Sequence, residues 1–119
     1  HCAMMKPAEE KMREVLSDME FKNAAFPIIQ NFTALAHTKA EDLRENLIRQ
    51  VSAPVRWMQS MEFVRKNVKN VTIGFECGTG KVLSGLLKKI DSEGFRVFNT
   101  SSLEDLENIE KFIKTGVLV

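Results

Sequence analysis

The stretch VTIGFECGTGKVLSGLLKKI, residues 71–90, indicates the fold class, because it predicts a strand, a glycine turn and a helix in immediate succession. Residues 71–75 alternate as a strand does, and residues 78–80 form a glycine turn. Residues 81–90 place their apolar side chains on one helical face. A strand that passes directly into a helix is typical of α/β proteins.

The same stretch does not match either of the common glycine-rich phosphate loops. A P-loop needs a glycine five positions before its second glycine and a hydroxyl residue after its lysine. Phe75 and Val82 stand at those two positions. A dinucleotide loop fails as well, because no glycine follows Gly80 at the required spacing. We therefore expect these glycines to turn the backbone rather than to bind phosphate.

Helical and strand signals alternate over the rest of the chain. Helices are expected from Lys6-Pro7, from the capping box Thr38-x-x-Glu41, over residues 55–67 and from the capping box Ser101-x-x-Glu104. Further strands are expected at residues 25–30 and 96–99.

Strands separated by helices predict crossover connections and a largely parallel sheet with helices on both faces. Ligands of such sheets sit at the carboxyl ends of strands. That rule places Asn31 and the turn at residues 76–80 at the edge of the expected site.

Composition excludes several classes of partner. The 119 residues are 44% apolar with a net charge of +1, so nothing in the charge balance indicates nucleic acid or an anionic membrane. No apolar run approaches the roughly 20 residues of a membrane span. Cys2 and Cys77 lie far apart, without metal-ligand spacing. We expect two reduced thiols, no metal, no cofactor and a cytoplasmic location.

Three stretches, taken in order, resemble one family. They are HCAMMKPAEEKM at residues 1–12, LIRQVSAPVRWMQSM at residues 47–61 and ECGTGKVLSGLLKKI at residues 76–90. Together with the strand that ends at Asn31, they resemble the carboxy-terminal part of malonyl-CoA:acyl-carrier-protein transacylases of bacterial fatty-acid synthesis. Acyltransferase domains of polyketide synthases are more distant relatives. The resemblance implies part of a hydrolase-like, parallel-sheet acyltransferase domain.

The resemblance also implies a reaction and two partners, malonyl-CoA and acyl carrier protein. A serine in a G-x-S-x-G elbow accepts the malonyl group from coenzyme A, and the phosphopantetheine thiol of the carrier protein then takes it. A histidine removes the proton from each nucleophile in turn and returns it to each leaving group. An imidazole can do both near neutral pH.

Residue roles follow from the resemblance position by position. His1 matches the catalytic histidine, and Gln50 matches the glutamine whose main-chain carbonyl accepts a bond from the far ring nitrogen of that histidine. Asn31 either faces the substrate pocket or simply ends a strand. Lys88 and Lys89 either face the acidic carrier protein or are solvated cations at a helix end. The family pattern assigns no functional role to His37, and we expect this side chain to be solvated on a polar loop.

The sequence lacks the nucleophile that this reaction needs. No G-x-S-x-G occurs in the 119 residues. Residues 1–119 are therefore expected to be the carboxy-terminal segment of the large domain, inactive alone and associated with the upstream part of the same enzyme. The expected sheet would otherwise expose an apolar edge and face.

Two other functions remain open. One is an acyltransferase domain of a polyketide synthase, and the other is a non-catalytic module that binds carrier protein. Retention of His1 and Gln50 at the family's spacing favours the enzyme over the binding module.

Overall fold

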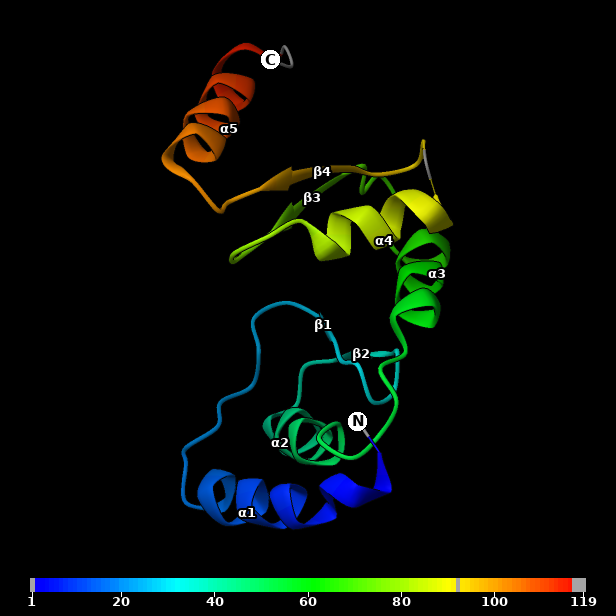
Figure 1. Ribbon diagram of the computed structural model, residues 1–119, viewed down its shortest axis with the longest axis vertical. Coiled ribbons are helices and arrows are strands. Elements are labelled where there is room, and N and C mark those ends of the chain that lie inside the picture. The colour runs from blue at the N-terminus through cyan, green and yellow to red at the C-terminus, as the bar shows by residue number, and fades with distance from the viewer. Residues whose placement is uncertain (1, 92, 117–119) are drawn as a thin grey trace. The chain divides into compact units, whose positions relative to one another are not determined.

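The computed structural model describes residues 2–91 and 93–116. The chain divides into two compact units, one up to Asn67 and one from Val68 onward, and each is described by itself. Figure 1 shows the elements of both units.

The first unit contains most of the helices. It comprises η1 (Ala3–Met5), α1 (Lys6–Ser17), β1 (Ile28–Ile29), β2 (Ala36–His37), α2 (Ala40–Arg49) and α3 (Trp57–Asn67). Helix α1 packs along α2 (Figure 1). The small apolar core of this unit includes Ala34, Leu43 and Ile48, and the Ile48 side chain is 1% exposed.

The strand expected at residues 25–30 is shorter than predicted and pairs differently. Only Ile28–Ile29 is extended in a ladder, and it pairs antiparallel with β2. The reason lies in the connection. A parallel partner needs a crossover of a dozen or more residues, whereas only residues 30–35 separate β1 from β2. His37 lies in β2 and is half-buried, so the expectation of a solvated loop histidine was wrong.

Helix α2 begins without the expected capping box. Its N-cap is Lys39, and no side chain of the cap accepts a bond from the helix. Instead, Asn23 Oδ1 accepts a hydrogen bond from the Ala40 N–H at 2.9 Å. The first turn is thus satisfied by a residue 17 positions earlier in the sequence.

The second unit is the α/β part that residues 71–90 predict. It comprises β3 (Ile73–Glu76), α4 (Val82–Ile90), β4 (Arg96–Asn99) and α5 (Leu103–Thr115). Strands β3 and β4 pair in parallel, with Ile73 opposite Arg96 and Glu76 opposite Asn99.

Helices cover both faces of this parallel pair. The Phe98 ring lies 4.9 Å from that of Phe112 on α5. The next residue, Asn99, faces Ser84 on α4, whose Oγ is 3.4 Å from Asn99 Oδ1. Successive side chains of a strand point to opposite faces, so α4 and α5 lie on opposite sides (Figure 1). The predicted α/β class and the two-sided covering are confirmed.

Helix α5 has a capping box one residue later than predicted. Ser102 is the N-cap, its side chain accepts the Asp105 N–H at 3.1 Å, and the Asp105 carboxylate accepts the Ser102 N–H at 3.1 Å. Gly116 closes the helix in the left-handed region, at a φ of 66°.

Candidate functional site

Two of the sequence-predicted site residues, Asn31 and Gln50, line the same pocket in the first unit. The pocket has a volume of about 360 Å³ and lies between β1 and α2. Its other lining residues are Phe21, Ile28, Ile29, Gln30, Leu43 and Leu47. The structure therefore brings together a strand end and a helix end that are 19 positions apart in the sequence.

Gln50 is the C-cap of α2. Its N–H donates to the Asn46 carbonyl at 3.0 Å, in the regular helical pattern. The last four carbonyls of a helix have no partner within the helix, and they form the negative end of its dipole. The Gln50 carbonyl therefore lies at the negative end of the α2 dipole.

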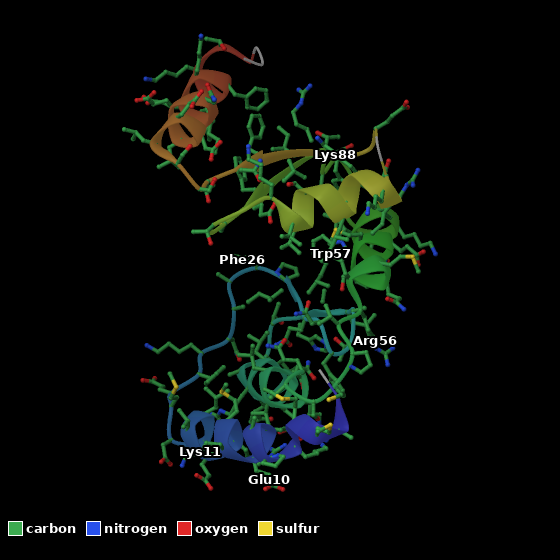
Figure 2. All side chains as sticks on the ribbon, in the orientation of Figure 1. Glu10, Lys11, Phe26, Arg56, Trp57 and Lys88 are labelled. Carbon is green, nitrogen blue, oxygen red and sulfur yellow. The ribbon has the colours of Figure 1, made fainter. Side chains whose placement is uncertain are left out.

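Asn31 is fixed through its backbone. Its carbonyl accepts a hydrogen bond from the Arg56 N–H at 3.2 Å, just before α3 begins. Figure 2 labels Arg56 at this position. Asn31 is half-buried and is the second residue after β1. The end of the strand and the start of α3 therefore hold it at the pocket wall.

A buried amide pair, which the sequence reading missed, supports the same pocket. Gln30 Nε2 donates to the Leu43 carbonyl at 2.9 Å, and Gln30 Oε1 accepts from Asn46 Nδ2 at 2.9 Å. Both side chains are buried, and these two bonds give the amide oxygen and nitrogen of Gln30 a partner. A signal exists in the sequence: Asn46 interrupts the apolar stripe of α2, three positions after Leu43.

The candidate base, His1, lies outside the described residues. The first described α-helix, α1, is joined to the turn after α2 by Glu9. The Glu9 carboxylate accepts hydrogen bonds from Ser52 Oγ and from Lys6 Nζ, the latter at 2.9 Å. These bonds, that from Ser52 first, lower the pKa of Glu9 below its ordinary value.

A second link between α1 and α2 lies on the surface. Glu45 accepts a bidentate pair from Arg13, at 2.7 and 3.1 Å, and a further bond from Arg49 at 2.7 Å. The Arg13 bond and then the Arg49 bond lower the pKa of Glu45 to about 2. The carboxylate is ionised at neutral pH and holds both helices.

The glycine turn at the end of β3 is structural in its described contacts. Gly78 and Gly80 have φ values of 124° and 94°, which side chains rarely adopt. Glu76, the last residue of β3, is buried and accepts the N–H groups of Leu83 and Ser84, each at 2.9 Å. These backbone bonds lower the pKa of Glu76. Its carboxylate thus caps the first turn of α4.

Lys88 and Lys89 occupy the last turn of α4 and are both exposed. Figure 2 shows Lys88 on this helix. Cations at this end interact favourably with the helix dipole, and their exposure leaves them accessible to a partner. The geometry is compatible with either of the two roles stated above.

Cys2 and Cys77 are exposed free thiols. Across residues 2–91 and 93–116, no group of three or more His, Cys, Asp or Glu side chains is arranged to hold a metal ion. None of the helices described is long and apolar enough to cross a bilayer.

Solved structures define the class of protein to which this fold corresponds. A malonyl-transacylase in complex with the acyl-carrier protein of a type II polyketide synthase matches with a TM-score of 0.80 and 35% identity, over 91% of this chain and 34% of that one. The corresponding enzyme of Streptococcus pneumoniae matches with a TM-score of 0.83 and 30% identity, over 93% of this chain and 35% of that one. The chain has the α/β fold of part of an acyltransferase.

Two curated relatives have the same name. The malonyl CoA-acyl carrier protein transacylase of Bacillus subtilis is 41% identical over 115 residues, 97% of this chain and 34% of the relative. The protein of the same name from Salmonella typhimurium is 39% identical over 90 residues, 76% of this chain and 28% of the relative. No protein-family model matches. The predicted resemblance is confirmed: the chain is similar, along nearly all its length, to about one third of malonyl CoA-acyl carrier protein transacylases.

Proposed function

We propose that this chain is the base-bearing third of an enzyme that transfers malonyl groups from coenzyme A to acyl carrier protein. The observation that supports this most is the 41% identity over 115 residues to a protein named for that activity. The pocket shared by Asn31 and Gln50 is consistent with it.

The proposed reaction has two halves. In each half His1 accepts one proton from the nucleophile and then donates it to the leaving group. The nucleophilic serine attacks the malonyl thioester while His1 takes its proton, and His1 then protonates the departing coenzyme A thiolate. In the second half, the carrier-protein thiol attacks the seryl ester and His1 takes the thiol proton. That proton returns to the serine oxygen as the malonyl group leaves.

Gln50 acts in this scheme through its carbonyl at the end of α2. An acceptor bonded to one ring nitrogen fixes the tautomer, so that the other nitrogen faces the nucleophile. The negative end of the helix dipole stabilises the imidazolium that forms. Asn31 would border the acyl group in the apolar pocket.

The nucleophile and the group that binds the malonyl carboxylate would come from the rest of the enzyme. No G-x-S-x-G motif occurs in this chain, which spans about a third of the curated relatives that it matches. The 119 residues alone would therefore be inactive, and they would work in the cytoplasm as part of the complete protein. A base without its nucleophile cannot form the seryl ester.

The test is an assay of the complete protein that carries this chain. It is incubated with malonyl-CoA and the holo forms of a fatty-acid and a polyketide carrier protein, and the mass of each carrier is measured. Malonylation of the fatty-acid carrier supports the proposal, and transfer only to the polyketide carrier supports the alternative acyltransferase. Binding of either carrier without transfer would identify a non-catalytic module.

A further inference from the structure

Glu9 is an unusual residue to find buried in α1. Among the twelve residues of this helix, all of which the structure describes, Glu9 alone is buried, and it is 8% exposed. The apolar residues Met12 and Val15 of the same helix are exposed. A carboxylate leaves water only where hydrogen bonds and charges compensate for the lost hydration.

The compensation comes from two directions. Lys6, one turn earlier on α1, approaches both carboxylate oxygens at 3.0 and 2.9 Å. Ser52, which is 43 positions later in the sequence, donates its hydroxyl to Oε2. Arg13 adds a weaker favourable charge from the following turns of α1. The Ser52 bond is charge-assisted, and such bonds are stronger than neutral ones.

Ser52 is two residues beyond Gln50, in the turn that follows α2. The N–H of Val51, between them, donates to the Ile48 carbonyl at 3.3 Å. The residues at 50–52 therefore form one short segment, bound at its start by α2 and at its end by Glu9. On the other side of the link, α1 directly follows the segment at residues 1–5.

We propose that Glu9, through Ser52, is a positioning residue that fixes the Gln50 carbonyl relative to α1, the helix that follows His1 in the sequence. This inference rests on the proposed function, because it assigns the link to the alignment of base and acceptor. Neither residue touches the reacting atoms. Loss of the link lets the turn after α2 relax, and a misplacement of about 1 Å near a catalytic base costs on the order of 100-fold in rate.

The chain offers a matched control. Lys11 and Glu14 repeat the Lys6 and Glu9 arrangement on the same helix, with the same spacing and a distance of 2.7 Å. Glu14 is exposed and lies on α1 one and a half turns after Glu9. In Figure 2, Lys11 points outward from α1. Glu14→Gln therefore removes one carboxylate charge from the same helix without touching the turn after α2.

The experiment compares Glu9→Gln, Ser52→Ala, Ser52→Thr and Glu14→Gln in the complete protein. We expect kcat for malonyl transfer to fall about 10- to 100-fold in Ser52→Ala, with the KM for malonyl-CoA unchanged. The fall should be smaller but measurable in Glu9→Gln, because the amide oxygen can still accept the Ser52 hydroxyl but has lost the charge that strengthens the bond. Ser52→Thr keeps the hydroxyl and should restore near-normal kcat, and Glu14→Gln should match the wild type. Equal kcat in Glu9→Gln and Glu14→Gln, or no rescue by threonine, would overturn the proposal.

A second readout does not depend on activity. Amide hydrogen exchange at Gln50 and Val51 should be faster in Glu9→Gln than in the wild type or in Glu14→Gln. If the wild-type protein transfers no malonyl group, the proposed function fails, and this measurement still decides whether the link exists. Unchanged exchange at both amides would refute the link itself.

Discussion

Glu76 joins a strand to the helix that follows it through a single carboxylate. It ends β3 and accepts the N–H groups of Leu83 and Ser84, so the first turn of α4 is satisfied by the preceding strand. Because these bonds favour the ionised form, they lower the pKa of Glu76. The glycine turn between strand and helix reverses the chain, so that the start of α4 lies next to the Glu76 carboxylate.

The pKa of Glu76 predicts a pH-dependent contribution to stability. A carboxyl group whose pKa is lower in the folded than in the unfolded state stabilises the fold above the unfolded value, near 4.5, and this contribution disappears as the pH falls through the folded pKa. Glu76→Gln should therefore lower the urea midpoint of unfolding at pH 7. The difference from the wild type should shrink steadily below about pH 4.5. A difference that is constant from pH 7 to pH 3 would contradict this account.

The sequence predicted some of the individual residues that line the pocket or support it, and it missed others. It missed those whose partners are distant in the sequence. Asn31 and Gln50 were named from the resemblance, and they line one pocket; their roles stay predictions. Glu9 was not among the predicted site residues. Its bond to Ser52 spans 43 positions, and no local pattern encodes such a contact.

The elements show how side-chain caps compete at helix ends. For α5, the pattern Ser-Ser-Leu-Glu-Asp offers two overlapping capping boxes, and the structure uses Ser102 with Asp105 rather than Ser101 with Glu104. For α2, the predicted Thr38 box is replaced by Asn23 from a distant loop. The existence and type of these helices could be predicted from their apolar spacing. Their first residues could not, because neighbouring or remote side chains compete for the same N–H groups.

The two serines before α5 provide a direct test of the cap. Ser102→Ala removes the acceptor for the Asp105 N–H and should destabilise the helix by about 1 kcal/mol. Amide exchange in the first turn of α5 should then accelerate by about fivefold. Ser101→Ala is the matched control and should have a smaller effect, although it loses a bond to Asp105 Oδ2. A larger effect at Ser101 would support the cap predicted from the sequence.

Helix α4 carries Lys88 and Lys89, for which the sequence left two roles open: facing the carrier protein, or a solvated helix end. Exposed charges at the edge of an interface mainly speed association. The double variant Lys88→Glu and Lys89→Glu should raise the KM for carrier protein several-fold at low salt, with the KM for malonyl-CoA unchanged. The effect should weaken at high salt. Lys11→Glu with Lys22→Glu makes the same charge change elsewhere, and an equal effect there would refute a specific role for α4.

Across the whole chain, large apolar side chains remain exposed on both units. They include Met12 and Val15 of α1, Phe26 before β1, Phe75 of β3 and Ile113 of α5. The predicted helices were found, but several of their apolar faces have no partner within the described residues. Periodicity identifies an apolar face and cannot say which segment covers it. The curated relatives are about three times as long as this chain, and their further residues are the candidates for that role.

These exposed faces predict the behaviour of the isolated chain. Residues 1–119 expressed alone should self-associate, because exposed strands and apolar helix faces promote aggregation. Co-expression with the rest of the complete protein should give a soluble complex. Sedimentation of both samples at equal concentration would distinguish the states. A monomeric isolated chain that unfolds cooperatively would contradict this expectation.

His1 is proposed to be the base of a malonyl transfer, and the other histidine of the chain serves as the control. The chain has two histidines, and His37 is bonded to Thr33 at 2.9 Å in β2, without a predicted role. In the complete protein, malonylation of carrier protein should fall about 10²- to 10⁴-fold in His1→Ala. His37→Gln, which can keep the bond to Thr33, should remain near the wild-type rate. Undiminished transfer by His1→Ala would contradict the account.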